Sequence, residues 1–158
     1  MPNLSLVEFI AHITKAIAEE NEHEHEALEK AAELVEREAK RELGNYQDSA
    51  GPFGAWPELA DRTQDDRVHK GFTANDPGLR TGEMRESIGH EVGDKEAVIG
   101  SNDDHMVYFE LGTENQPPRS VLGTALVRKA PDVARILGEG VVSALVGKGV
   151  FLGRMPAA

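Results

Sequence analysis

The sequence predicts an α+β fold in which a long N-terminal helix, a small antiparallel sheet and a C-terminal helix form one domain. Residues 3–43 contain neither Gly nor Pro. Residues 87–111 contain short runs of β-branched and aromatic residues separated by turns, and residues 121–146 return to a helical apolar spacing. A chain of 158 residues suits one domain. We assign residues 1–146 to that domain, with the C-terminal helix packed on the sheet, and 147–158 to a flexible C-terminal tail.

The first predicted element is a helix over residues 3–43. Its apolar residues recur at the three-to-four spacing of a helix stripe, in two groups. The groups are Leu6, Ile10, Ile13 and Ile17, and then Leu28, Ala32, Val35, Ala39 and Leu43. Residues 19–26 between them are almost wholly polar. This pattern predicts either one helix of about 40 residues, roughly 60 Å long, or two helices that meet near Asn21.

Residues 45–82 are predicted to form a long extended loop. Gly44 suits the position that follows a helix C-terminus. The composition then changes to Gly, Pro, Asp, Asn and Thr, with isolated apolar residues and no period. A loop of this length inside a compact domain is typically functional or mobile. The Trp56-Pro57 pair looks like a fixed anchor in it, although covering the edge of the core is the simpler role for Trp56.

The sheet is predicted within residues 83–112 as an antiparallel meander of three or four strands. The candidate strands are 87–92, 97–101 and 106–111, separated by the turn-forming residues 93–94 and 102–104. Residues 121–146 then form one helix broken at Pro131 or two short helices. The Gly-rich tail carries isolated apolar residues, and it is predicted to be flexible alone or to dock on a partner. These residues are Val150, Phe151, Leu152 and Met155.

Composition and charge restrict the classes of function. The net charge is −11, which repels phosphate backbones and disfavours tight nucleic-acid binding. The absence of cysteine excludes disulfides and predicts synthesis in a reducing cytoplasm. No apolar run reaches the length of a membrane span. Residues 3–43 carry a net charge of −6 and residues 119–158 a net charge of +4. These regions are either two solvated faces of opposite sign or surfaces through which neighbouring subunits attract each other.

No motif indicates catalysis, a metal site or a cofactor. The run His23-Glu24-His25-Glu26 lacks the four-residue spacing with which two histidines bind zinc from one helix. His105 lies beside two aspartates, in what is better explained as a turn. The chain has no Gly-x-Ser-x-Gly motif, and no phosphate-binding loop of the Walker or dinucleotide type. We therefore expect no enzyme, no catalytic residue and no cofactor.

Three stretches, in order along the chain, carry a resemblance to a known family. They are Trp56-Pro57-Glu58-Leu59, the run LRTGEMRESI at 79–88 and the run YFELGTENQPPRSVLGTAL at 108–126. The last run resembles the end of the final strand, the Pro-rich turn and the following helix of tail-completion or head–tail joining (neck) proteins of long-tailed bacteriophages. The first two are similar to a tryptophan-containing loop and a strand entry in related virion-morphogenesis proteins. The chain departs from the pattern at two places. The family often has Pro-Phe where this chain has Ser120-Val121, and the family has Pro where this chain has Thr124.

The resemblance implies a structural virion protein that forms a homo-oligomeric ring, usually a hexamer, at the head–tail junction. Its expected partners are neck proteins on the head-connector side and the tail tube or tail terminator, and DNA would pass through the lumen without specific binding. The alternatives are a tail terminator or head-completion protein, or a cytosolic adaptor or regulatory binding module outside the virion. The residues expected at a subunit or partner interface are Trp56, Tyr108, Glu110, Gly112, Thr113, Pro117, Pro118 and Arg119.

Overall fold

A computed structural model describes the backbone of residues 6–147 and the side chains of residues 22–140. The elements in chain order are α1 (Leu6–Glu42), α2 (Asp61–His69), α3 (Glu83–Glu86), β1 (Ile88–Val92), β2 (Ala97–Ser101), α4 (Asp104–Leu111) and α5 (Leu122–Gly147). This arrangement confirms the predicted α+β class, with a two-stranded sheet. The predicted flexible tail lies, from residue 148 onward, outside the described residues.

The N-terminal segment forms a single helix, so the polar stretch at 19–26 does not interrupt it. α1 runs for 37 residues, which corresponds to about 55 Å. It ends before Gly44, whose φ of 94° lies in the left-handed region that glycine tolerates best. The Gly44 amide donates to the carbonyl of Pro77 at 2.8 Å. The end of α1 is therefore tied to the chain that enters the sheet.

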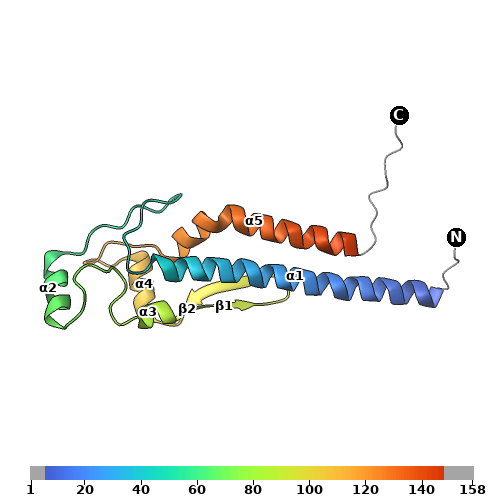
Figure 1. The fold of residues 1–158 in the computed structure, drawn as a ribbon, viewed down its shortest axis with the longest axis horizontal. Helices are drawn as coiled ribbons and strands as arrows, with labels where there is room; N and C mark the ends of the chain where they lie inside the picture. The colour runs from blue at the N-terminus through green and yellow to red at the C-terminus, as the bar shows by residue number, and fades with distance from the viewer. Residues whose placement is uncertain (1–5, 148–158) are drawn as a thin grey trace, which may run out of the picture.

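α1 lies in the middle of the molecule, with α5 along one side and the β1–β2 hairpin along the other (Figure 1). The prediction that the C-terminal helix packs on the sheet is therefore wrong, because its main partner is α1. Alanines on α1 allow the two helices to approach closely. A Cβ added at Gly140 would come within 2.6 Å of the Ala27 Cβ. A two-stranded hairpin offers too little surface to cover a helix of 26 residues, whereas α1 runs beside α5 over much of its length.

The hairpin pairs β1 with β2 in antiparallel register, from Ile88 opposite Ser101 to Val92 opposite Ala97. The predicted third strand at 106–111 is wrong, because these residues belong to α4. Asp103 caps this helix by accepting a hydrogen bond from the His105 amide at 2.9 Å. The residues that α4 buries, Met106 and Phe109, are three positions apart, which is helical spacing rather than strand alternation. Capping and burial therefore override the strand propensity of the valine and aromatic residues.

The segment from 45 to 82 is not wholly irregular, because it contains α2. This helix has almost no apolar residues, and its one valine, Val68, is 58% exposed. The residue that α2 buries is Arg67, so an apolar stripe could not reveal this helix.

Residues 121–146 are predicted as one helix broken at Pro131 or as two short helices. The structure has a single helix, because α5 continues through Pro131. Figure 1 shows a bend in α5, as expected where a proline removes a hydrogen-bond donor.

The core is small and draws on segments from most of the described chain. Its members are Val35, Ala39, Leu43, Trp56, Ile88, Met106, Phe109, Val121 and Ala125. The long segment contributes Trp56, which lies edge-on to Phe109 with ring centroids 5.3 Å apart. This core holds the end of α1, the Trp56 loop, α4 and the start of α5 together. The candidate site lies beside it.

Candidate assembly site

The three stretches that carry the resemblance meet around one cleft. Four segments line it, namely 58–67, 78–84, 103–109 and 115–119, and its volume is about 770 Å³. We call this space the α2–α4 cleft. The segments are separated by up to 61 positions in the sequence, so only the fold brings them together. Each residue expected at an interface lies in one of these segments or within three positions of one.

Glu110 caps the N-terminus of α5 from a distance of about ten residues in the chain. Its carboxylate accepts from the amides of Val121, Leu122 and Gly123 at 2.6, 3.0 and 3.1 Å, and from the Ser120 hydroxyl at 2.5 Å. The first amides of a helix have no partner inside the helix, and the helix dipole favours a negative charge at this end. Glu110 therefore fixes the start of α5 relative to α4.

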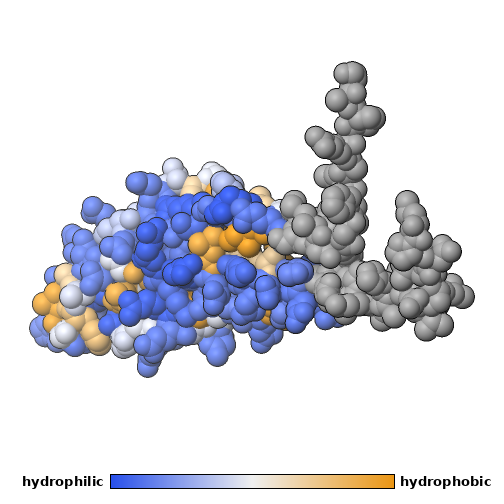
Figure 2. Space-filling model, turned by 45° about the vertical axis from the view of Figure 1, so that its right-hand side comes forward, coloured by the Kyte–Doolittle hydropathy of each residue, from blue (hydrophilic) through white to orange (hydrophobic). Residues whose placement is uncertain are grey.

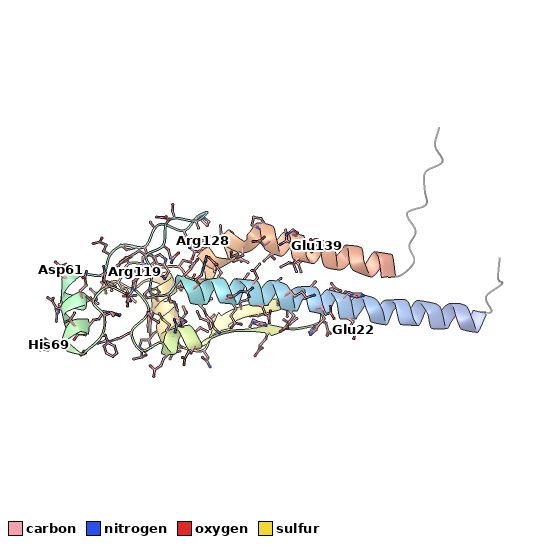
Figure 3. The ribbon with its side chains drawn as sticks, viewed as in Figure 1. Glu22, Asp61, His69, Arg119, Arg128 and Glu139 are labelled. Carbon is pink, nitrogen blue, oxygen red and sulfur yellow. The ribbon has the colours of Figure 1, made fainter. Side chains whose placement is uncertain are left out.

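Arg119 joins the Pro-rich turn to the loop that carries Trp56. It is 3% exposed, and its Nε and Nη2 donate to the carbonyls of Pro57 and Glu58 at 2.8–3.0 Å. Its guanidinium also lies 5.8 Å from the centre of the Phe109 ring. Burial lowers the pKa of Arg119, but an arginine retains its charge in proteins. Figure 3 shows Arg119 in the region between α2 and the start of α5.

Trp56 connects the same loop to α5. Its indole nitrogen donates to the Ser120 carbonyl at 2.9 Å, and its side chain is 5% exposed. The side chains of Trp56 and Arg119 are thus directed into the protein and hold the site together from inside. The burial of Trp56 agrees with the simpler of its two predicted roles, which is to cover the edge of the core. In this conformation the Trp56 side chain offers no direct contact to a neighbouring subunit, whereas Arg119 also lines the α2–α4 cleft.

The turn after α4 is exposed and tightly built. Gly112 has a φ of 76°, and a Cβ there would lie 2.7 Å from the Pro118 nitrogen. Thr113 and Gln116 exchange backbone hydrogen bonds at 2.8 and 3.2 Å. Thr113 and both prolines that precede Arg119, Pro117 and Pro118, are exposed. This turn therefore presents an edge whose backbone has little freedom to rearrange.

α4 presents an apolar face beside this turn. Its exposed apolar residues are Val107, Tyr108 and Leu111, which are 55%, 53% and 73% exposed. They occupy neighbouring positions on one helix face, opposite the buried Met106 and Phe109. Elsewhere much of the surface is hydrophilic, and Figure 2 shows such a face broken by a few apolar patches. Exposed apolar patches of this kind commonly mark protein contacts.

Arg67 is a second buried arginine at the α2–α4 cleft, and the sequence did not reveal it. It is 6% exposed, and it donates from Nε to the Thr73 carbonyl and from Nη2 to the Leu79 carbonyl at 2.8 and 2.7 Å. Arg80 nearby pairs with Asp66 at 3.1 Å and lies over the Phe72 ring. A buried arginine whose partners are backbone carbonyls leaves no trace in residue spacing, so only the fold identifies it.

A buried network also links α1 to α5. Glu42 is 2% exposed, accepts a hydrogen bond from the Thr124 hydroxyl and pairs with Arg128 at 2.9 Å. Burial raises the pKa of the Glu42 carboxyl, despite the opposing hydrogen bond from Thr124 and charge of Arg128. Lys129 lies 3.5 Å from Glu38 on the same interface. Part of the charge contrast between the two ends of the sequence is therefore used within one chain.

His90 forms a separate polar cluster between β1 and α1. It hydrogen-bonds to Glu36 through Nδ1 and to Glu29 through Nε2, the latter at 3.1 Å. The hydrogen bond to Glu36 and then that to Glu29 raise the pKa of His90. For Glu36, burial raises the pKa, but the hydrogen bonds from Lys40 and His90 and their charges together lower it. This cluster is a charged contact that holds the hairpin on α1.

The described part of the chain contains no group of three His, Asp or Glu side chains arranged to hold a metal ion. None of the helices that the structure describes combines the length and apolarity that crossing a membrane requires. The prominent features of the α2–α4 cleft are thus hydrogen-bonded arginines, exposed apolar side chains and a stiff turn. These features suit the binding of another protein segment.

No family model matches this chain, and no curated protein or solved structure matches it either.

Proposed function

We propose that this chain is a non-enzymatic structural subunit of the head–tail junction of a long-tailed bacteriophage, active in tail completion or head–tail joining. The observation that carries the proposal is the convergence of the three resembling stretches on the α2–α4 cleft. The cleft also has the mixture of apolar side chains and polar groups that protein contacts use.

The mechanism is assembly. Copies of the chain join head-to-tail around an axis and close into a ring, which for this family is usually a hexamer. Glu110 and Arg119 hold the start of α5 and the Pro-rich turn in place. The exposed turn and the apolar face of α4 then form a rigid contact surface. A rigid surface loses little conformational freedom on binding, which favours association.

The two openings of the ring contact different neighbours, a neck protein on the head-connector side and the tail tube or tail terminator on the other. DNA passes through the lumen. A chain with a net charge of −11 repels the phosphate backbone, which favours passage without specific binding. In this role the protein is assembled in the host bacterial cytoplasm and becomes part of the virion.

The test is the mass of the purified chain together with its place in phage particles. We expect native mass spectrometry to show a closed oligomer at a multiple of 17.2 kDa, and negative-stain images to show rings. Antibody labelling of virions is expected at the neck. A monomer at all concentrations that is also absent from virions would contradict the proposal. If that monomer bound a cytosolic protein through α1, an adaptor role would replace the virion role.

A further inference from the structure

The two buried arginines of the α2–α4 cleft each retain an unused donor. Arg67 and Arg119 bond to backbone carbonyls through Nε and Nη2 only. No described residue accepts a hydrogen bond from Nη1 of either side chain. No described side-chain nitrogen or oxygen is fully buried without a partner, so these Nη1 atoms keep access to solvent. The open space that both residues line is the cleft. It therefore offers two charged donors to the acceptor groups of a ligand.

The other residues that line the cleft indicate which further chemical groups that ligand carries. Leu59, Met84 and Tyr108 supply apolar wall, and Tyr108 is 53% exposed. Glu58 and Glu83 are exposed and form no ion pair with a described residue. A volume of about 770 Å³ lies within the range of pockets that enclose small ligands. A short peptide fits this description if it offers backbone carbonyls to the arginines, apolar side chains to the wall and a cation to the carboxylates.

The chain itself contains such a segment at residues 148–155, which read KGVFLGRM. It has two basic residues, Lys148 and Arg154, and no acidic residue. Its apolar residues include the adjacent Val150, Phe151 and Leu152. Its apolar side chains match the apolar wall, and its two cations match the carboxylates of Glu58 and Glu83, which have no cationic partner among the described residues. Arg80, which also lines the cleft, is already paired with Asp66.

This segment cannot reach the cleft of its own chain. α5 begins three residues after Arg119, at the edge of the cleft, and leads away from it along α1 (Figure 1). Its 26 residues span about 39 Å. Phe151 follows the last residue of α5, Gly147, by four positions, which extend over at most about 14 Å. If this segment occupies a cleft, that cleft therefore belongs to another copy.

We propose that the α2–α4 cleft of one copy binds residues 148–155 of a second copy. The contact is heterologous, because the surface that binds on one copy differs from the surface that is bound. Repeated contacts of this type close into a ring when the rotation between copies divides the circle. The inference rests on the proposed ring function, for which it names the contact that joins successive subunits.

The test uses two full-length variants with complementary defects. Phe151→Glu spoils the inserted segment and retains a sound cleft. Leu59→Arg spoils the cleft and retains a sound segment. Val98→Glu, at a 60% exposed position on β2 outside the cleft, is the matched control. Fluorescence of Trp56, the chain's one tryptophan, checks that each variant folds. If Leu59→Arg does not fold, Glu58→Arg at the exposed rim replaces it.

We expect the wild type and Val98→Glu to form the ring, and each of the two defective variants to be monomeric by analytical ultracentrifugation. Mixed in equal amounts, the two variants are expected to form a dimer and nothing larger, because only one sound segment and one sound cleft can combine. Self-association of each variant is expected to weaken by at least about tenfold. Rings formed by both variants would overturn the inference and leave the ring function standing.

A second measurement separates the inference from the proposed function. A synthetic peptide of residues 147–156, labelled with a fluorophore, is titrated into the full-length Phe151→Glu chain. Binding that is lost when Leu59→Arg is added to the same chain supports the cleft assignment, even if the wild type never forms a ring. In that case the ring function alone fails. Absence of peptide binding to a folded chain overturns the inference.

Discussion

At the scale of single residues, three charged side chains hold this molecule together from inside. Glu110 accepts from the amide just before α5 and from the first two amides of α5, while Arg119 and Arg67 donate to backbone carbonyls of loops. Charged hydrogen bonds of this kind are stronger than neutral ones, and a buried charge left without partners is costly. Glu110 and Arg119 therefore stabilise the fold of the site, and the exposed part of this stretch lies between them.

Replacing Glu110 tests its role as the cap of α5. Glu110→Ala removes the acceptor of three helix amides, so we expect the free energy of unfolding to fall by about 1–3 kcal/mol. Urea unfolding followed by Trp56 fluorescence measures this. Glu114→Ala, at an exposed position in the same turn, is the control and is expected to change stability by less than about 0.5 kcal/mol. Equal effects of the two substitutions would contradict the role of Glu110.

The cluster around His90 predicts a dependence of stability on pH. The pKa of His90 is raised in the folded chain, so its protonated form contributes stability that is fully present below the unfolded value of about 6.5. That contribution is lost as the pH rises through the folded value. The pKa of Glu36 is lowered, so its carboxylate stays charged throughout this window. The free energy of unfolding is measured with urea at about pH 6 and about pH 9. Between these two pH values it is expected to fall less for His90→Gln than for the wild type.

The control for this experiment is His69→Gln, because His69 is exposed at the end of α2. This variant is expected to lose stability with rising pH as the wild type does. A wild type and a His90→Gln variant with the same pH profile would show that protonation of His90 contributes nothing to stability.

At the scale of elements, the contact between α1 and α5 determines the shape of the molecule. The two helices approach closely at Ala27 and Gly140, and they are joined by the Glu42–Arg128 and Glu38–Lys129 pairs. The hairpin occupies the opposite side of α1 (Figure 1). α1 is therefore the central element on which the others are arranged.

Two glycines of α5 provide a matched test of this contact. A Cβ added at Gly138 meets nothing within 4 Å, whereas one at Gly140 would lie 2.6 Å from the Ala27 Cβ. Gly138→Ala is expected to stabilise the fold by about 0.5–1 kcal/mol through helix propensity. Gly140→Ala is expected to destabilise it by about 1–3 kcal/mol, because the helices must separate. Thermal unfolding measures both, and stabilisation by Gly140→Ala would contradict the close approach.

At the scale of the whole molecule, one small core joins segments from most of the described chain. Trp56 of the long segment, Ile88 of β1, Phe109 of α4 and Val121 beside α5 all belong to it. A core shared in this way favours cooperative unfolding, because no element retains its packing when another leaves.

We therefore expect Trp56 fluorescence and far-ultraviolet circular dichroism to report the same urea midpoint. The fluorescence follows the core, and the dichroism follows mainly α1 and α5. A loss of ellipticity at clearly lower urea than the change in fluorescence would show that the helices melt apart from the core. The Val98→Glu variant, altered outside the core, provides the reference for a change that leaves cooperativity intact.

The sequence by itself determined the elements whose signals are local. Apolar spacing and the absence of Gly and Pro predicted the N-terminal helix, Gly44 marked its end, and turn residues marked the hairpin at 87–101. These signals succeed because the period of apolar residues reflects the geometry of the element that carries them. The same locality explains why the predicted α+β class is confirmed while one strand is wrong. In residues 104–111, the capping Asp103 and the burial of Met106 and Phe109, three positions apart, outweighed the strand propensity of the other residues.

Only the tertiary structure decided which faces meet. The sequence could not show that α5 packs on α1, that Arg67 is buried within α2, or that the three resembling stretches meet at one cleft. Each of these depends on partners outside the element itself, such as the carbonyls of Thr73 and Leu79, 6 and 12 positions along the chain, that accept from the guanidinium of Arg67. A backbone carbonyl is present at every residue, so its use as a partner leaves no sequence pattern. The elements are therefore determined locally, and the site by their packing.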